Sequence, residues 1–216
     1  MKLIATTIAL LSLVISTNLI AVPTMMPSDE AEAKYTADIE KRVTGILDAL
    51  NLDDVAKKEK VHDILIAQYR ALRDWQTQHE SELKKKGITA EQKAEIIATR
   101  KPLHDSFLAK LSEQLTPEQV ETVKDKLTYN KVQVTYRGYV EIVGNLTETQ
   151  TAKILEYLKE ARELAMDGGS SEEKTDIFNK YKGRINNYLS KEGVDMKKST
   201  ADWNARRAGA ATKPAN

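Results

Sequence analysis

Cysteine is absent from the 216 residues of this chain, which excludes disulfide bonds, thiolate metal sites and cysteine nucleophiles. Its absence permits an oxidising compartment without requiring one. Histidine is scarce, and His62, His79 and His104 show no metal-ligand spacing, so we expect no metal site. Lys and Arg number 33 against 32 Asp and Glu, which leaves a net charge of +1 and no polybasic segment. We therefore expect no nucleic-acid partner.

The N-terminus has the pattern of a secretory signal. Lys2 supplies a positive charge, Leu3–Ile20 is largely apolar, and Ala21 is a suitable cleavage residue. We predict a signal peptide over residues 1–21 and a periplasmic or secreted protein without membrane attachment after cleavage. The alternative is an uncleaved anchor, because the apolar run is almost long enough to span a bilayer. No cysteine follows the run, which excludes the lipid attachment of a bacterial lipoprotein.

The remaining chain has the composition of a soluble globular protein, with 41% hydrophobic and 30% charged residues. Its length suits one domain of one or two lobes. Apolar residues recur at helical spacing through most of it. We predict an all-α fold: a single helical domain over residues 34–205, with about six helices in antiparallel layers. The Gly, Ala and Pro content of residues 206–216 predicts a disordered tail.

Several residues predict where helices begin and end. Asp53 is placed to cap a helix that should end near Gly87. Pro102 lies inside the next apolar pattern and should break or kink that helix. Residues 129–136 alternate polar and apolar side chains, but a strand there would have no partner, so we expect a helix with an irregular start. Gly168 and Gly169 should separate the last two long helices.

Three pentads mark further helix starts. They are Ile88-Thr89-Ala90-Glu91-Gln92, Leu115-Thr116-Pro117-Glu118-Gln119 and Leu146-Thr147-Glu148-Thr149-Gln150. In each, the Thr can cap the helix while the Gln three residues later bonds back to the Thr amide, which is a capping box. Residues 170–173, Ser-Ser-Glu-Glu, form a fourth candidate. The pentads also resemble the LTxxQ signature of periplasmic helical chaperones of the Spy and CpxP type. That resemblance implies a dimer whose concave surface holds unfolded protein clients.

A longer resemblance extends from about Leu111 to Trp203. It rests on four segments, Gln119–Tyr129, Glu160–Asp167, Ser170–Lys174 and Lys180–Leu189. These segments are similar to a family of exported bacterial proteins of unknown function. The family occurs in bacteria that degrade polysaccharides, and sugar binding has been ascribed to it. The chain departs from the expected pattern at residues 176–179, Asp-Ile-Phe-Asn, where we expect a His and an aromatic residue.

The segment Lys180–Leu189 combines helix-poor residues with side chains suited to binding. Gly183 costs about 1 kcal/mol relative to Ala inside a helix. Lys, Arg and Asn side chains fall on one helical face beside a stripe of tyrosines. Tyrosine rings can stack on sugar rings while amides and guanidinium groups bond to hydroxyls. The candidate ligand-binding residues are Tyr129, Tyr136, Lys180, Arg184, Asn186 and Asn187.

Structural explanations of the same residues stay open. The polar face could simply be solvated, and the tyrosines could belong to the core. Residues 160–162, Lys174 and Arg184 could instead form an ion-pair network that joins the last two long helices. Carboxylates are abundant, so a pair such as Glu160 and Asp167 is weak evidence for a glycosidase.

We therefore predict an exported protein that binds a carbohydrate or a cell-envelope polymer, with no catalytic residues and no cofactor. A Spy-like chaperone or envelope-stress module is the alternative. A hydrolase or lyase that acts on sugars is the third hypothesis.

Overall fold

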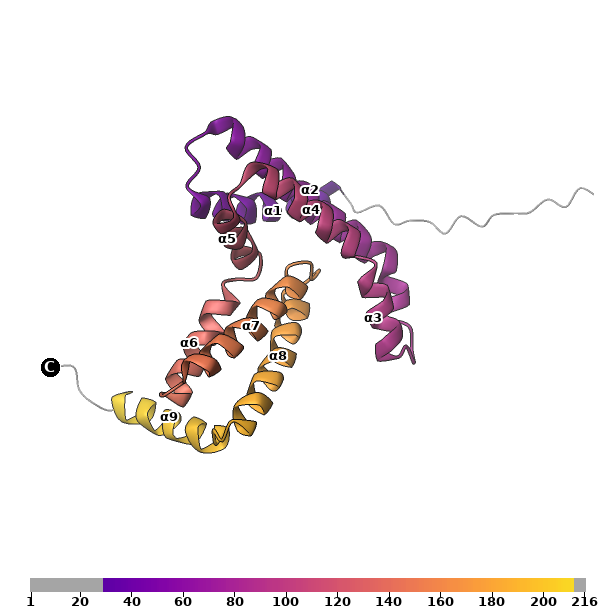
Figure 1. Cartoon of the computed structure of the whole chain (residues 1–216). Helices are drawn as coiled ribbons and strands as arrows, with labels where there is room; N and C mark the ends of the chain where they lie inside the picture. The colour runs from indigo at the N-terminus through magenta and orange to yellow at the C-terminus, as the bar shows by residue number, and fades with distance from the viewer. Residues whose placement is uncertain (1–28, 212–216) are drawn as a thin grey trace, which may run out of the picture.

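The structure, a computed structural model, describes residues 29–211, and this part of the chain consists of helices joined by turns (Figure 1). The helices are α1 (Asp29–Leu50), α2 (Val55–Leu83), α3 (Ala90–Ala98), α4 (Lys101–Gln114), α5 (Pro117–Leu127), α6 (Lys131–Val143), α7 (Glu148–Ala165), α8 (Ser171–Lys191) and α9 (Met196–Ala211). The prediction of a single all-α domain is confirmed. The expected six helices are too few: residues 29–211 contain nine, or eight if α3 and α4 count as one interrupted helix.

The pentads are helix starts, because Thr89, Thr116 and Thr147 each head a complete capping box at α3, α5 and α7. Each Thr hydroxyl accepts a hydrogen bond from the amide of the Gln three residues later, at 3.2–3.3 Å. Each Gln side chain accepts one from the Thr amide, at 3.0–3.1 Å. The LTxxQ spacing is thus explained by local helix capping.

Other predicted boundaries hold with small shifts. Pro102 stands at the first turn of α4, so it separates α3 from α4 as its missing amide requires. The cap of α2 is Asp54, one residue later than predicted, and it accepts a hydrogen bond from the Lys57 amide. Tyr129 and Asn130 have φ of 58° and 53°, which form the irregular start of α6. Helix α9 continues to Ala211, so residues 206–211 are helical where we predicted disorder.

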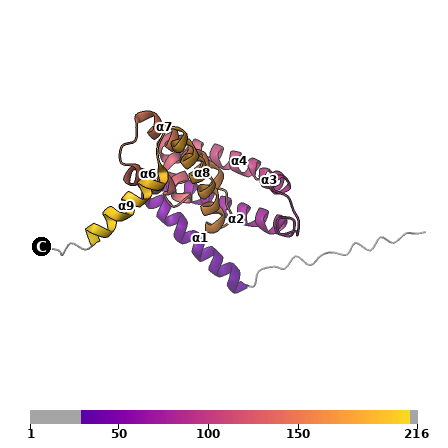
Figure 2. The ribbon, with the colours of Figure 1, turned by 90° about the horizontal axis from the view of Figure 1, so that it is seen from below.

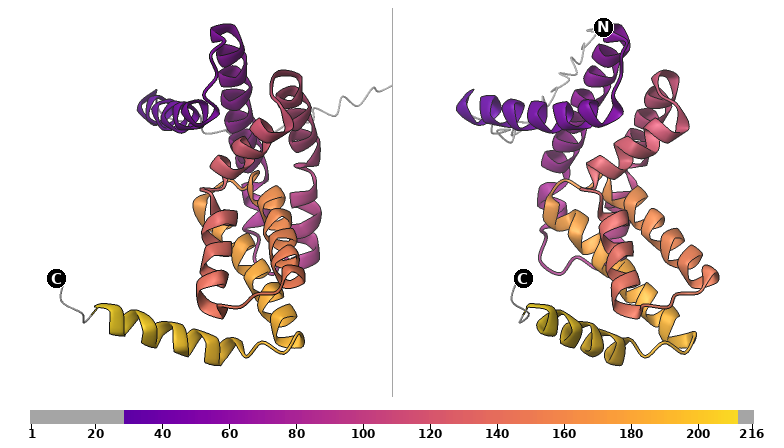
Figure 3. Two further views of the ribbon diagram at one scale, coloured as in Figure 1. Left: turned by 60° about the vertical axis from the view of Figure 1, so that its left-hand side comes forward. Right: turned by 90° about the vertical axis from the view of Figure 1, so that its left-hand side faces the viewer.

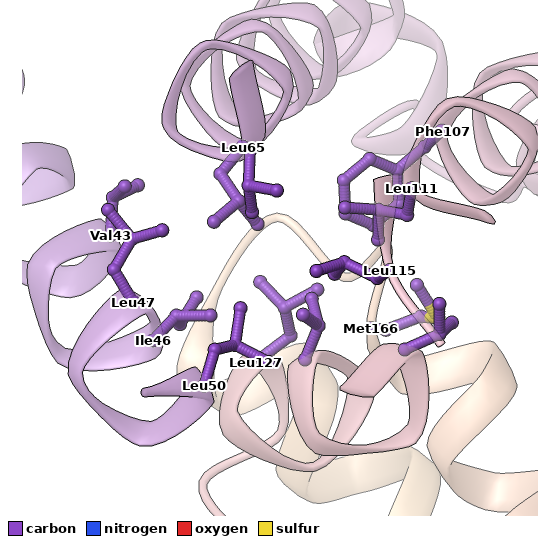
Figure 4. Packing of buried hydrophobic residues seen from close by; sticks show 13 residues of the cluster. Val43, Ile46, Leu47, Leu50, Leu65, Phe107, Leu111, Leu115, Leu127 and Met166 are labelled. Carbon is purple, nitrogen blue, oxygen red and sulfur yellow. The ribbon is translucent and has the colours of Figure 1, made fainter. Parts of the chain in front are cut away.

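The first core lies among α1, α2, α4 and α5, which form the N-terminal lobe with α3 (Figure 4). Leu65 and Leu111 are fully buried there, and Leu115 and Val120 flank the α5 cap in the same core. Met166, from the end of α7, also belongs to this core. A side chain from the end of α7 is therefore buried in the core of the N-terminal lobe.

The second core lies among α6, α7 and α8, which form the C-terminal lobe with α9. Ile154, Leu158, Phe178, Ile185 and Leu189 are buried in it. Helix α9 lies across the end of this lobe that is remote from α1 and α2 (Figure 3). Helices α3 and α9 project at opposite ends of the molecule (Figure 2). The helices thus surround two cores, a different arrangement from the predicted pair of antiparallel layers.

Arg162 ties the two lobes together. Its guanidinium, 4% exposed, donates to the Asp125 carboxylate at 2.6 Å and pairs with Glu121, both on α5.

The predicted signal peptide over 1–21 lies outside the described residues, as do residues 212–216 of the predicted tail. None of the described helices is both long and apolar enough to cross a membrane.

Candidate functional site

A cleft of about 250 Å³ lies where the two lobes meet. Helices α1 and α2 form one wall, and the α5–α6 turn and the α7–α8 loop form the other. The residues that line it are Tyr35, Asp38, Ile39, Arg42, Leu65, Gln68, Tyr69, Leu72, Arg73, Gln76, Thr77, Leu127, Tyr129, Met166, Gly168, Gly169, Ser170 and Lys174. Its volume is just below the 300–1,000 Å³ or so of typical ligand pockets, so it suits a small ligand or one unit of a longer one.

Three tyrosines shape the walls. Tyr35 donates its hydroxyl to the Tyr69 carbonyl at 2.9 Å, and the Arg73 guanidinium lies over its ring at 4.3 Å. Burial raises the pKa of Tyr69 to about 12, although nearby Arg42 lowers it. The Tyr69 phenol is therefore protonated at neutral pH. Tyr129 is 46% exposed and presents its ring from the opposite side of the cleft.

The backbone turn at Tyr129 explains why this ring reaches the cleft. Helix α5 ends at Leu127, and the left-handed conformations of Tyr129 and Asn130 separate it from α6. The Tyr129 amide donates to Lys126 O at 3.1 Å, and the Asn130 amide donates to Asp125 O at 2.8 Å. Two successive non-glycine residues in this region are uncommon and carry a conformational cost. The turn is therefore held by its hydrogen bonds.

Lys174 lies at the base of the cleft and is only 6% exposed. Its ammonium donates to Leu127 O at 2.8 Å and to Met166 O at 3.3 Å. No carboxylate of the described residues forms an ion pair with it. Burial lowers the pKa of Lys174 to about 8, although Asp167 acts in the opposite direction. A protonated lysine here is a buried charge whose partners are uncharged: the two carbonyls and the Tyr129 ring, whose centroid is 5.9 Å from the ammonium.

The α7–α8 loop is held in place by α2 and α4. The Asp167 carboxylate accepts from Gln68 at 3.3 Å and contacts His104 Nδ1 at 2.7 Å. Arg100 donates to Asp167 O at 3.1 Å and pairs with Glu173 at 2.7 Å. These bonds fix the backbone of residues 168–170 against the cleft.

Both glycines of this loop are closely packed, Gly168 more tightly than Gly169. A Cβ at Gly168 would lie 2.9 Å from Lys174 Cγ and 3.1 Å from Ala165 O. A Cβ at Gly169 would lie 3.1 Å from the side-chain oxygen of Gln76. The sequence identified the glycine pair as a helix break. Its second role, which is to let the loop approach Lys174 and α2, depends on contacts between distant residues.

The structure divides the sequence-predicted site residues between two places. Tyr129 lines the cleft, whereas Lys180, Arg184, Asn186 and Asn187 are exposed along α8. Tyr136 is partly buried against the second core. Arg184 is ten residues beyond Lys174, which corresponds to about 15 Å along the helix. The predicted residues thus do not form a single site.

The α8 surface is largely satisfied by its own contacts. The Arg184 guanidinium lies over the rings of Tyr157 and Tyr181, at 4.7 and 4.6 Å, and pairs with Glu160 at 3.1 Å. Asn186 accepts a hydrogen bond from the Tyr139 hydroxyl at 2.8 Å. One face of two tyrosine rings is therefore covered by Arg184, and its charge already has a carboxylate partner.

The hypothetical ion-pair network forms only in part. Arg184 and Glu160 do join α8 to α7. Arg162 turns instead to α5, and Lys174 contacts carbonyl groups. Asp167 is bonded to Gln68 and His104, so it does not face Glu160 as a catalytic partner.

The histidines have structural contacts. His104 pairs with Asp167, His79 stacks on Trp75 with ring centroids 4.5 Å apart, and His62 contacts Glu40 at 2.9 Å. The sequence pattern assigned no partner to His104, because its pairing with Asp167 joins residues 63 positions apart. Within residues 29–211, no group of three or more His, Asp or Glu side chains is arranged to hold a metal ion.

A family model described as "Protein of unknown function (DUF3826)" matches residues 36–208. The match includes every described residue of the cleft except Tyr35. No curated protein matches the chain.

Proposed function

The chain belongs to the DUF3826 family, whose function is unknown, and we propose from the geometry of the cleft that it binds carbohydrate. The binding site comprises the tyrosine walls and the polar groups between them. In this proposal one sugar unit of a longer chain enters the cleft between the lobes. The protein acts outside the cytoplasm in polysaccharide utilisation, as the signal pattern and the family resemblance indicate.

The observation that carries the proposal is the composition of the cleft. Tyr69 and Tyr129 supply aromatic surface, which suits the C–H faces of a sugar ring, whereas one face of the Tyr35 ring is covered by Arg73. Gln76, Ser170 and other polar side chains lie between them and can bond to hydroxyl groups. Aromatic walls with a few convergent polar groups are typical of small-molecule sites.

The α8 surface supports the proposal less well. Arg184 is already stacked and ion-paired, so a ligand there would have to displace existing contacts. The cleft has free volume and needs no such displacement. Of the six candidate residues, Tyr129 is therefore the one to which we assign ligand contact.

Binding without hydrolysis fits the acidic groups available. A typical glycosidase needs two carboxylates on either side of the scissile bond. Among the residues that line the cleft, only Asp38 carries one.

A chaperone would need a broad apolar surface, but the exposed large hydrophobic residues lie on five separate elements. They are Val55, Ile97, Tyr129, Val134, Val140 and Leu164.

Calorimetry of the mature protein against a panel of oligosaccharides tests the proposal. Tyr129→Asn removes the ring while keeping a residue that tolerates the left-handed backbone. We expect it to weaken binding about tenfold, the upper range of a single aromatic contact. Arg184→Ala is the matched control on α8 and should bind like the unmodified protein.

Three results would contradict the proposal. They are no binding to any saccharide, full binding by Tyr129→Asn, or loss of binding in Arg184→Ala alone. Affinity for unfolded protein in place of saccharides would support the chaperone alternative.

A further inference from the structure

We propose that the saccharide bound in this cleft is anionic, and that Lys174 and Arg42 together receive its carboxylate or sulfate group. This inference rests on the proposed function and specifies the class of ligand. It follows from the charges around the cleft and from which of them already have partners.

The cations of the cleft differ in how they are neutralised. Arg73 pairs with Glu32 at 2.6 Å, so its charge is balanced within the protein. Lys174 contacts two carbonyl oxygens, and Arg42 has no ion pair to any carboxylate of the described residues. Asp38 stands one turn before Arg42 on α1, yet the two side chains are not in ion-pair contact. Two cations thus line the cleft without a counter-ion.

Acidic groups near Lys174 are engaged elsewhere. Asp167 is bonded to Gln68 and His104, and Glu173 is bonded to Arg100 and to the Gly169 amide at 2.8 Å. Neither is available to move onto Lys174 without breaking these contacts. The groups around its ammonium are, by element, Arg42 on α1, Tyr69 on α2, Arg100 before α4, Tyr129 in the α5–α6 turn, Asp167 in the α7–α8 loop and Glu173 on α8.

The N-terminal end of α8 also borders the cleft, although Glu172 and Glu173 in its first turn offset part of its positive charge. Residues 168–170 line the cleft, and Ser170 caps this 21-residue helix by accepting from the Glu173 amide. The N-terminal end of a helix carries a partial positive charge that favours nearby anions. It acts here together with Lys174, which lies in the first turn of the same helix.

A buried ammonium without a counter-ion is costly, and an anionic ligand would relieve that cost. The same reasoning predicts coupling to protons. Without ligand, Lys174 is partly deprotonated near pH 8, because burial lowers its pKa to about 8. An anion against Lys174 Nζ favours the protonated form, so binding at pH 8 should take up roughly half a proton. At pH 6.5 the uptake should be close to zero.

The experiment compares charged and neutral ligands of matched structure. The probes are trigalacturonate with α-1,4-galactotriose, triglucuronate with cellotriose, and a sulfated trisaccharide with its unsulfated form. Calorimetry at pH 8 in two buffers of different ionisation enthalpy gives affinity and proton uptake together. We expect a charged member to bind at least tenfold more tightly than its neutral partner, with the difference reduced by salt. The pair that shows the difference identifies carboxylate or sulfate.

Two variants connect the effect to the cleft. Lys174→Met should abolish the proton uptake and most of the preference for charge. Arg42→Gln lies on the exposed face of α1, so it should fold normally and still reduce that preference. Arg184→Gln removes an exposed cation outside the cleft and should change neither.

The outcomes separate this inference from the proposed function. Equal or tighter binding of the neutral trisaccharides overturns the inference and leaves carbohydrate binding in place. A preference for charge that survives in both Lys174→Met and Arg42→Gln also overturns it. Absence of binding to every saccharide overturns both proposals.

Discussion

Lys174 makes stability depend on pH in a direction that can be calculated. In the unfolded chain the lysine keeps its proton up to its ordinary pKa of 10.5, whereas burial lowers the folded value to about 8. Between these values the unfolded state binds more protons, so the free energy of unfolding rises as pH increases. Below pH 8 both states are protonated, and the folded protein bears the full cost of the buried charge.

The size of the effect follows from the difference between the two pKa values. Each pH unit corresponds to about 1.4 kcal/mol, so the cost at neutral pH is about 3 kcal/mol. Between pH 7 and pH 10 about 2 to 3 kcal/mol of it should be recovered. For a urea dependence of about 1–3 kcal/mol per molar, the midpoint of unfolding should rise by roughly 1 M.

Lys174→Met isolates this contribution from other titrating groups. The variant also removes the hydrogen bonds to Leu127 O and Met166 O, which offsets part of the gain from removing the charge. The informative quantity is therefore the stability of the unmodified protein minus that of the variant, measured by urea unfolding from pH 7 to pH 10. We expect this difference to rise with pH by about 2 to 3 kcal/mol. A difference that stays flat or falls would refute the argument that Lys174 is buried as a charge without a counter-ion.

Three further predictions concern α8, the α7–α8 loop and α4, each measured by urea unfolding. Gly183→Ala in α8 meets nothing within 4 Å and should stabilise the fold by about 0.5–1 kcal/mol; a loss of stability would contradict the helix assignment at this residue. Gly168→Ala should instead destabilise by about 1–3 kcal/mol, because its Cβ would meet Lys174 Cγ at 2.9 Å. His104→Gln should cost more stability at pH 5.5 than at pH 9. The hydrogen bond to Asp167 raises the pKa of His104, so its stabilisation is complete below 6.5 and disappears as pH rises through the raised value. An equal cost at both pH values would show that the charged form of His104 contributes nothing.

Local signals in the sequence specify much of the helical framework. Thr116 and Gln119 cap α5 through contacts only three residues apart, and Pro102 acts through its own missing amide. Helix boundaries of this kind can be predicted from a few neighbouring residues, without the rest of the fold. The predicted count of about six helices was too low, although the pentads, Pro102 and the irregular start near Tyr129 each marked a boundary that the structure contains.

The cleft could not be predicted from the sequence, because the residues of its two walls are far apart in the chain. Tyr35 and Lys174 both line it, and helix periodicity says nothing about how two lobes meet. One signal was available. Lys174 shares the buried stripe of α8 with Phe178, Ile185 and Leu189, and a charged residue on an apolar stripe is a candidate for a special role. The sequence instead predicted a binding site at Lys180–Leu189, further along the same helix.

Mapping of backbone amide chemical shifts during titration with an acidic trisaccharide tests the central claim most directly. The cleft hypothesis predicts that the largest shifts occur at residues 168–170, at Tyr129 and at Lys174, with little change around Arg184. Shifts concentrated on the exposed surface of α8, or none at saturating saccharide, would contradict it.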